Sequence, residues 1–454
     1  MSFKEIFLII FMMFNSLFSL LLYNFYSYDI LFSISIVLNL SLSLFILVKK
    51  SPEDYTVKLS IVYLGGFALF ICGRNIANLF GASDIYCFDF GYTYCLTDIE
   101  KLRANFLINF SLIFFILGFC YRSRKNSLPD HRYSESVNKR MLILIILISF
   151  FTGFISLYFQ YQTIIKALSQ GYMVLYEGQG EIYQTPVALL CNLVFAATLA
   201  VVHSVKNSVK PIAYYFLIAI YIIAQMSSIL TGARGSFISS VIVLLWIALG
   251  NGKIGLKKTL FIFFGFIVLL SANFLASLTE ARIATNKGSL YEKIVHEVLY
   301  DQGISMMVFN IGSLESDYPT LAYLKTIFPG IQFFYSFFNE IYQYQLSFSQ
   351  FITYKLAPSV YFNNMGWGWT LLGDFYAFSF GFFIVFLFYN FIWGKLIFTI
   401  SNLSYSSIYF RGLFFCFMLV AFTISRASVS YLIFFIVLYS IFHLSLKLVI
   451  KVKS

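Results

Sequence analysis

Long apolar runs recur along the whole sequence, and they constrain its fold more than any other feature. Each run is about 17 to 23 residues long, and about 20 apolar residues cross a bilayer as one helix. The chain is 60% hydrophobic and 11% charged, whereas a soluble domain carries about 25% charged residues. A β-barrel would show alternating segments of about ten residues instead. The pattern therefore predicts an all-α polytopic membrane protein.

The runs predict about twelve transmembrane helices. They lie at roughly 3–22, 30–48, 59–80, 105–120, 141–160, 185–203, 211–229, 237–250, 259–276, 369–392, 410–425 and 431–447. The first run has no small-residue cleavage site after it, so we expect it to remain as an anchor.

The positions of Lys and Arg predict the orientation, because these residues gather in short cytoplasmic loops. With the N-terminus inside, the inner side holds 20 of the 31 basic residues and 5 of the 20 acidic residues. The net charge of +11 then divides into about +15 inside and −4 outside. Both termini are therefore expected in the cytoplasm, and the basic balance reflects topology rather than binding to nucleic acid.

The chain divides into three parts. Residues 1–276 hold the first nine spans, 277–368 form a long periplasmic loop, and 369–454 hold the last three spans. Apolar residues at helical spacing and an aromatic-rich second half predict amphipathic helices in the loop. A loop of this length usually has a function.

Several kinds of site are not indicated by the sequence. No G-x-x-x-x-G-K-[ST] motif is present, so direct use of ATP is not expected. No C-x-x-C pattern indicates a metal, and neither a metal nor another cofactor is expected. Cys87 and Cys95 share one outer loop, where they form either a disulfide or two free thiols.

A Thr-x-x-Arg pattern occurs three times near predicted outer ends of spans, ending at Arg234, Arg282 and Arg426. In "TGARGS" and "TISRASVS" an outer turn leads into a span, and Ser236 or Ser428 is placed to cap that helix. A helix start beside an Arg attracts anions. Gly235 lets the backbone approach an oxyanion closely. The alternative is that these Arg side chains contact lipid headgroups or cap the carbonyls of a neighbouring helix.

Candidate proton acceptors lie on the same side. His296 is the one histidine on the predicted outer side, and its alternative role is that of a solvated helix residue. Glu280 lies two residues before Arg282, and Asp301 follows in "DQGIS". Asp374 lies a few residues into the predicted span 369–392, where a carboxylate is expected to pair with an outer Arg.

These elements together resemble the bacterial O-antigen polymerases of the Wzy type. The resemblance rests on "TGARGSFI", "TEARIATN", "LYDQGISMMVF" and "GWGWTLLGDFYAF", whose order and spacing match across about residues 225–395. Asp374 departs from the pattern, because Glu is expected at this position.

The resemblance implies an inner-membrane glycosyltransferase that is similar to the GT-C class and works without a metal. It implies that undecaprenyl-diphosphate-linked oligosaccharides are joined on the periplasmic face, with a chain-length regulator and a flippase as pathway partners. Arg234 and Arg282 are expected to hold the diphosphate, and Glu280, His296 or Asp374 to accept the proton of the attacking hydroxyl. Further expected substrate contacts are Arg426, Arg74, Gly235, Ser236, Asp301, Gln302 and Tyr376.

Three other functions have to be weighed against this one. An O-antigen ligase shares topology and substrate, and the sequence separates the two poorly. A flippase would line a central cavity with charged residues in the middle of its spans, which are sparse here. A polyprenyl-monophosphate glycosyltransferase would carry an acidic pair in its first outer loop, where this chain offers only Asp29.

Overall fold

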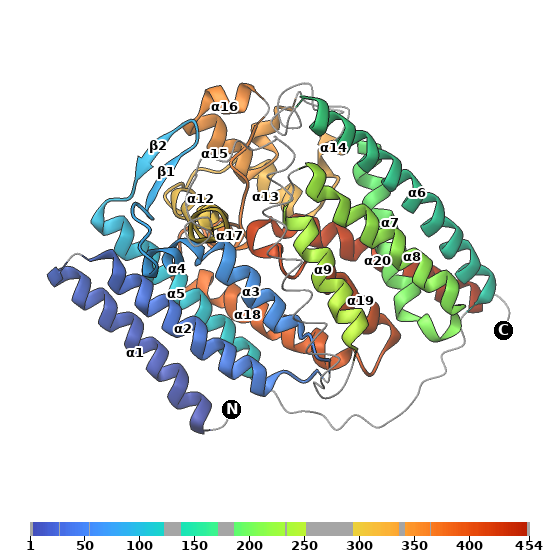
Figure 1. Ribbon diagram of the computed structural model, residues 1–454, viewed down its shortest axis with the longest axis horizontal. Helices are drawn as coiled ribbons and strands as arrows, with labels where there is room; N and C mark the ends of the chain where they lie inside the picture. The colour runs from blue at the N-terminus through green and yellow to red at the C-terminus, as the bar shows by residue number, and fades with distance from the viewer. Residues whose placement is uncertain are drawn as a thin grey trace.

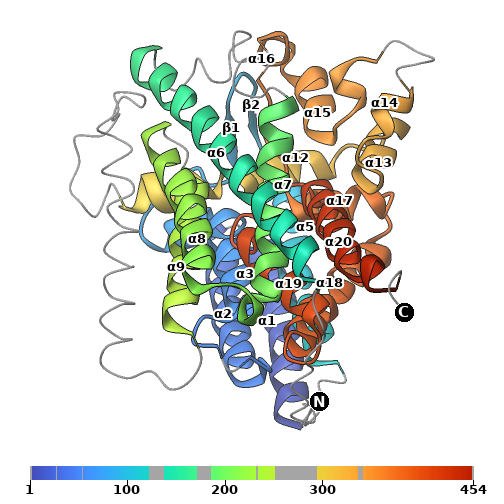
Figure 2. The same cartoon turned by 90° about the vertical axis from the view of Figure 1, so that its right-hand side faces the viewer.

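Long helices form two neighbouring groups, and a layer of short helices covers one end of both (Figure 1). The computed structural model describes residues 3–26, 28–53, 55–121, 138–170, 186–231, 234–250, 294–335, 341–363 and 365–451. Seen from the side, the layer lies on one side of the long helices (Figure 2).

The first group contains the N-terminal helices and the helix that follows the short layer. Its members are α1 (Phe3–Tyr26), α2 (Asp29–Lys50), α3 (Leu59–Phe70), α4 (Gly73–Leu79), α5 (Asp98–Cys120) and α18 (Phe383–Leu403).

The second group contains the middle of the chain and its C-terminal helices. Its members are α6 (Lys139–Gln170), α7 (Pro186–Ser204), η3 (Lys206–Ser208), α8 (Pro211–Met226), η4 (Ser227–Thr231), α9 (Arg234–Leu249), α19 (Ile408–Val420), η8 (Ile424–Arg426) and α20 (Val429–Lys451).

The covering layer contains one hairpin and many short helices. Its members are β1 (Cys87–Asp89), β2 (Thr93–Cys95), the π-helix η5 (Ile294–Tyr300), η6 (Gln302–Ile304), α12 (Ser305–Ser313), α13 (Thr320–Ile327), α14 (Ile331–Tyr335), η7 (Gln343–Gln345), α15 (Phe348–Leu356), α16 (Pro358–Phe362) and α17 (Leu371–Phe378).

The described helices confirm an all-α polytopic membrane protein. Eight of them are long and apolar enough to cross a membrane, or nine if the bent pair of α3 and α4 counts as one span. The shorter apolar helices α9 and α19 coincide with two further predicted spans. The predicted span 259–276 lies outside the described residues, so the total of twelve stays a prediction.

The predicted span 369–392 is wrong in its bounds. Helix α17 ends at Phe378, and a turn with Phe380 at φ 50° separates it from α18, which begins at Phe383. Because a left-handed backbone interrupts a helix, Asp374 lies in a short helix before the span rather than inside it.

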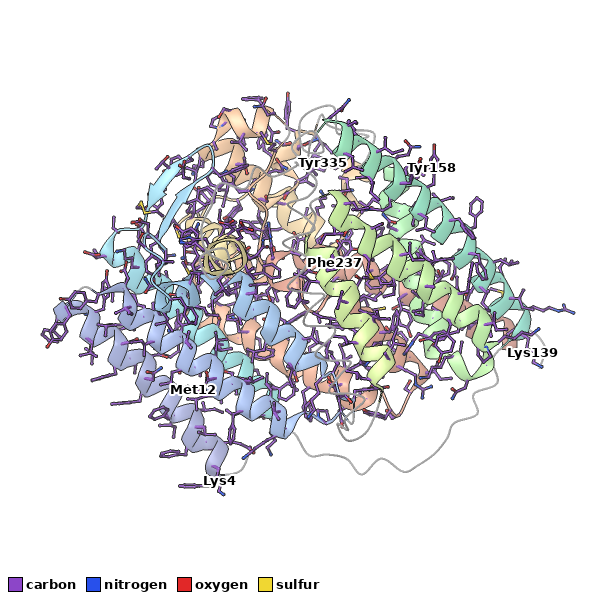
Figure 3. The ribbon with its side chains drawn as sticks, viewed as in Figure 1. Lys4, Met12, Lys139, Tyr158, Phe237 and Tyr335 are labelled. Carbon is purple, nitrogen blue, oxygen red and sulfur yellow. A yellow bond between two sulfur atoms is a disulfide. The ribbon has the colours of Figure 1, made fainter. Side chains whose placement is uncertain are left out.

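Large apolar side chains point outward from the long helices. Phe7 and Phe14 on α1 and Phe151 and Tyr158 on α6 are all exposed, and Tyr158 can be seen on the outer face of α6 (Figure 3). Exposed apolar surface of this extent is rare on soluble monomers. These faces are suited to contact with lipid.

Small and polar side chains hold the first group together. A Cβ at Gly118 would overlap the Phe391 carbonyl, and one at Gly394 would overlap the Phe115 carbonyl, so α5 and α18 approach closely. Asn39 on α2 donates to Asn109 on α5 at 2.6 Å and accepts from Asn15 on α1 at 3.0 Å. Small residues and buried amides are typical contacts between membrane helices.

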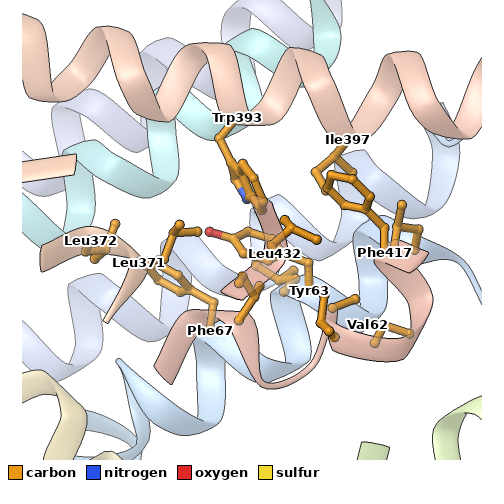
Figure 4. Close-up of a cluster of buried hydrophobic side chains, with 14 of the residues drawn as sticks. Val62, Tyr63, Phe67, Leu371, Leu372, Trp393, Ile397, Phe417 and Leu432 are labelled. Carbon is orange, nitrogen blue, oxygen red and sulfur yellow. The ribbon is translucent and has the colours of Figure 1, made fainter. Parts of the chain in front are cut away.

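One apolar cluster joins the two groups. It brings together side chains from α3, α17, α18, α19 and α20 (Figure 4). Its labelled members are Val62, Tyr63, Phe67, Leu371, Leu372, Trp393, Ile397, Phe417 and Leu432. The short helix α17 therefore contributes to the core that joins the two groups.

The hairpin of β1 and β2 is the only sheet among the described residues. Cys87 faces Cys95 across the antiparallel pair, and their Sγ atoms form a disulfide. The sequence left the disulfide and two free thiols equally open, and the structure shows the disulfide. Trp367 donates from Nε1 to the Phe90 carbonyl at 3.0 Å, so the hairpin packs on the segment that precedes α17.

Candidate functional site

Helix ends from distant parts of the chain meet in one place, which we call the junction. It contains η6, α13, α17, the first turn of α9, and the segment from Thr423 through η8 to the first turn of α20. Tyr323 on α13 donates to the Ala377 carbonyl at the end of α17 at 3.3 Å. Ser430 on α20 donates to the Lys325 carbonyl at 3.4 Å.

Asp374 is the buried centre of the junction. Its side chain is fully buried, Oδ1 accepts from Trp369 Nε1 at 2.7 Å, and Oδ2 accepts from the Val429 amide at 2.6 Å. Burial raises the pKa of this carboxyl to about 7, although these hydrogen bonds and one from Ser428 oppose the rise. These groups, rather than the expected Arg, are its partners among the described residues.

The start of α20 confirms one predicted cap. Helix α20 begins at Val429, directly after Ser428, whose Oγ accepts from the Ser430 amide at 3.2 Å. The anion that the free amides of this helix start attract is the protein's own Asp374 carboxylate.

The other predicted cap is wrong. Helix α9 already begins at Arg234, which places Ser236 inside its first turn rather than at the cap. The capping position is the residue before the first helical one.

Two of the three Thr-x-x-Arg turns lie side by side. A Cβ at Gly235 would lie 3.5 Å from Cγ2 of Thr423. The start of α9 therefore adjoins the segment that carries Arg426. Of the predicted residues here, Glu280, Arg282 and the side chain of Arg234 lie outside the described part of the structure.

Arg426 and Gln302 were both predicted to bind substrate, and the structure brings them together. Arg426 donates to Oε1 of Gln302 at 3.0 Å, and its guanidinium lies over the Phe70 ring at 5.7 Å. Gln302 is buried, while the Arg426 side chain is exposed. The amide thus fixes a guanidinium that still reaches solvent.

Arg74 is held differently. Its buried guanidinium donates to the carbonyls of Ile85, at 3.1 Å, and Cys87, and it stacks on the Tyr300 ring. Its backbone packs against Gly303, where a Cβ would overlap the Arg74 amide nitrogen. The observed contacts make Arg74 a brace between the disulfide hairpin and the segment that contains Gln302.

The remaining predicted residues lie around the junction. Tyr376 is buried on α17, two residues beyond Asp374 and therefore on another face of the helix. His296 lies on η5 with its ring 5.9 Å from that of Tyr300. Asp301 is exposed beside Gln302.

A comparison with protein-family models identifies the chain. The model for O-antigen polysaccharide polymerase Wzy matches residues 5–454.

The chain belongs to the Wzy family.

No curated protein matches significantly, and no solved structure does either. The match extends the resemblance from about residues 225–395 to nearly the whole chain. As a Wzy protein, the chain has the role of an O-antigen polymerase in polysaccharide biosynthesis, and its substrate is a lipid-linked oligosaccharide.

The junction of this Wzy protein contains a cation that the sequence did not single out. Lys325 on α13 is half-buried, and burial lowers the pKa of its ammonium. No carboxylate pairs with it among the described residues. The sequence around Lys325 does not indicate that it lies in the junction, because its position depends on how α13 packs against α20.

Two further contacts of this Wzy protein depend on residues that were not predicted. Trp369 holds Asp374, and Arg103 on α5 donates to the Tyr376 hydroxyl and to the Ser313 carbonyl. Trp369 could have been suggested by its position five residues before Asp374 in "GWGWTLLGD". Among the described residues, no group of three His, Cys, Asp or Glu side chains could hold a metal ion.

Proposed function

We propose that this protein joins undecaprenyl-diphosphate-linked oligosaccharide repeat units on the periplasmic face of the inner membrane. The observation that carries the proposal is the Wzy match over residues 5–454. The junction supports it, because it brings cations, a buried carboxylate and helix starts to one end of the long helices.

The distribution of charge supports the periplasmic side for the junction. Helix α2 begins with Asp29 and ends with Lys49 and Lys50. Asp29 also forms an ion pair with Lys101 at 3.1 Å, near the start of α5. By the preference of Lys and Arg for the cytoplasm, the far end of α2 is inside and both termini are cytoplasmic.

The proposed reaction exchanges one bond at an anomeric carbon. A hydroxyl oxygen of the incoming repeat unit attacks the anomeric carbon of the growing chain, and a new glycosidic C–O bond forms. The C–O bond to the diphosphate breaks, its electron pair leaves with undecaprenyl diphosphate, and the hydroxyl proton passes to a protein base. Preorganised cations stabilise the charge that develops on the leaving diphosphate.

The cations of the junction are assigned to the diphosphate. Arg426 is fixed by Gln302 and reaches solvent, and Arg234 begins the helix next to it. We assign Arg282 to the same role because it ends the remaining Thr-x-x-Arg pattern. An Arg guanidinium offers the paired donors that phosphate oxygens accept, and no metal is required for this role.

The proton acceptor is assigned to Glu280 or His296. Asp374 already accepts from Trp369 and Val429, so we assign it the task of holding the start of α20 and hence Arg426. Arg74 and Tyr376 are assigned to holding the surrounding helices, and Asp301, Gly235 and Ser236 to contacts with the sugar chain. The architecture is proposed to be related to the GT-C class, with a chain-length regulator and a flippase as partners.

The experiment is complementation of a null mutant, read as the ladder of lipopolysaccharide chain lengths. Arg234→Ala, Arg234→Lys and Arg426→Ala should abolish long chains while the protein level stays normal, because Lys cannot replace the paired donors of Arg. Arg140→Ala is the matched control, since Arg140 is exposed at the start of α6. A wild-type ladder from the Arg234 and Arg426 variants would contradict the assignment.

The null mutant itself separates the polymerase from its alternatives. A polymerase null should leave a single repeat unit on the lipopolysaccharide core. A core without any repeat unit would instead indicate a ligase or a flippase.

A further inference from the structure

The short helix α13 connects the starts of two long helices. Tyr323 donates to the Ala377 carbonyl at 3.3 Å, in the last turn of α17 and just before α18. The Lys325 carbonyl accepts from Ser430, in the first turn of α20, at 3.4 Å. Both α18 and α20 are long and apolar enough to cross a membrane, and α13 lies above α17 and α20 in Figure 2. Helix α13 therefore lies at the level where two spans begin.

The outer face of α13 is apolar. Leu324, Ile327 and Phe328 lie three or four residues apart, so they share one side of the helix, and all three are exposed. Lys325 beside them is half-buried, and no carboxylate pairs with it among the described residues. A helix with an exposed apolar face is typical of the boundary between lipid and water.

The turn between α17 and α18 continues this apolar surface. Phe380 and Phe382 are 70% and 68% exposed, and the Phe380 ring stacks on that of Tyr323 at 5.3 Å. Phe380 also has a φ of 50°, a left-handed conformation that is costly for a bulky side chain. Strain of this kind persists mainly where a residue has a function, and the exposed ring is the part of Phe380 that a ligand can reach.

The apolar surface of α13 and the turn adjoins the junction. Ala377 lies three residues after the buried Asp374, and Ser430 lies four residues after Arg426. Other exposed rings, such as Phe151 on α6, have no junction cation on their own helix. The substrate of the family is a lipid-linked oligosaccharide, whose lipid chain stays in the membrane while its sugars react. A surface beside both the junction and the start of two spans suits such a molecule.

We propose that the polyprenyl chain of the substrate lies against α13 and the α17–α18 turn while its diphosphate occupies the junction. This inference rests on the proposed function and adds the side from which the substrate enters. Lys325 contacts the diphosphate from the same helix. The isoprene units contact Leu324, Ile327, Phe328, Phe380 and Phe382.

The test combines variants with two substrates that differ only in their lipid. The purified full-length protein receives a repeat unit on undecaprenyl diphosphate, or the same repeat unit on a diphosphate with two isoprene units. Phe380→Asn removes the ring but tolerates the left-handed backbone, so the unfolding midpoint should not fall. With the long lipid, kcat/KM should fall about tenfold, because one large apolar contact is lost. With the short lipid, the variant and the wild type should react equally.

Two further variants complete the test. Phe382→Ala leaves the backbone of the turn unchanged and should show the same dependence on the lipid. Phe151→Ala is the matched control, since Phe151 is also 70% exposed but lies on α6, and it should leave kcat/KM unchanged with both lipids.

The outcomes separate this inference from the proposed function. Equal losses with the long and the short lipid, no loss with either, or an equal loss in Phe151→Ala would overturn the inference, because the surface would then contact bulk lipid only. Absence of polymer from the wild type with the undecaprenyl substrate would contradict the proposed function, and this inference with it.

Discussion

Asp374 joins two helices through one carboxylate. It lies in the first turn of α17 and accepts from the first amide of α20, which follows it by 55 residues. Its neighbour Trp369 satisfies the second oxygen. Since hydrogen bonds to a charged group are worth about 1.5 to 3 kcal/mol, the carboxylate contributes to fixing the segment that carries Arg426.

The raised pKa of Asp374 predicts a pH-dependent contribution to stability. The pKa of about 7 in the folded protein exceeds the ordinary value of 3.8, so the folded state binds more protons between these pH values. The free energy of unfolding therefore falls as pH rises toward 7, by up to about 1.4 kcal/mol per pH unit, and levels above it. The measurement is the unfolding midpoint from pH 5 to 8.

Asp374→Asn isolates this contribution. In the variant, the free energy of unfolding should fall less between pH 5 and 7 than it does in the wild type. Part of the remaining fall comes from Glu53, because burial raises the pKa of its carboxyl to about 7 as well. Identical pH profiles for the variant and the wild type would show that Asp374 does not titrate in this range.

Lys325 predicts a second effect at the residue scale. Its ammonium has no carboxylate partner among the described residues and lies on the helix that contacts α20. If it contacts a phosphate, Lys325→Gln should slow polymerisation about tenfold or more, since charged hydrogen bonds are worth about 1.5 to 3 kcal/mol. Polymer formed per minute in isolated membranes is the measurement.

A control for Lys325 lies in the same layer. Lys355 on α15 is paired with Glu315 at 2.5 Å and is exposed. Lys355→Gln should leave the rate nearly unchanged, because an exposed ion pair contributes little. Equal rates for the two variants would remove Lys325 from the site.

At the scale of elements, two neighbouring glycines on α3 differ in the space around them. A Cβ at Gly66 would overlap the Phe422 carbonyl, whereas one at Gly65 would lie 3.9 Å from the edge of the Phe422 ring. Phe422 comes just before the segment that carries Arg426. Gly66→Ala should therefore destabilise the protein by about 1 to 3 kcal/mol and shift the Arg426 turn.

The matched variant is Gly65→Ala, which adds the same methyl group one residue earlier. Gly65→Ala should leave the unfolding midpoint and the ladder of chain lengths unchanged. Gly66→Ala should lower the unfolding midpoint and shorten the ladder. Two equally mild variants would mean that α3 does not position the η8 turn.

Helices could be predicted where the cause was local, and their contacts could not. The apolar runs located the long helices, although α5 begins at Asp98 rather than at 105 and α6 extends to Gln170 rather than to 160. Ser428 marked the start of α20 correctly. The break after α17 was missed, because "SFGFF" continues the apolar run and only the left-handed Phe380 reveals the turn. Periodicity reports which residues are apolar but not where the backbone turns.

The site was predicted in its composition and only partly in its arrangement. Arg426 and Gln302 were both named, yet 124 residues separate them, so their contact depends on tertiary packing. Asp374 was expected to pair with an Arg, and among the described residues it accepts instead from the Val429 amide and the Trp369 indole. Lys325 and Arg103 were not named as site residues, because their contacts depend on the packing of segments far apart in the sequence.

At the scale of the whole molecule, we expect the two ends of the long helices to face opposite sides of the membrane. Ser83 lies exposed beside the disulfide hairpin, and Asn207 lies exposed in η3, at the opposite end of the long helices. In a background with Cys191→Ser, an impermeant maleimide should label Ser83→Cys from the periplasm but not Asn207→Cys. Labelling of Asn207→Cys alone would invert the proposed orientation.

The disulfide hairpin also sets an order of events during synthesis. The Trp367 indole that packs on the hairpin follows its partner Phe90 by 277 residues. At about 5 to 20 residues per second, the ribosome needs roughly 14 to 55 seconds to supply it. The covalent link between Cys87 and Cys95 can hold the two strands of the hairpin together during that wait, before the indole that packs on them has been made.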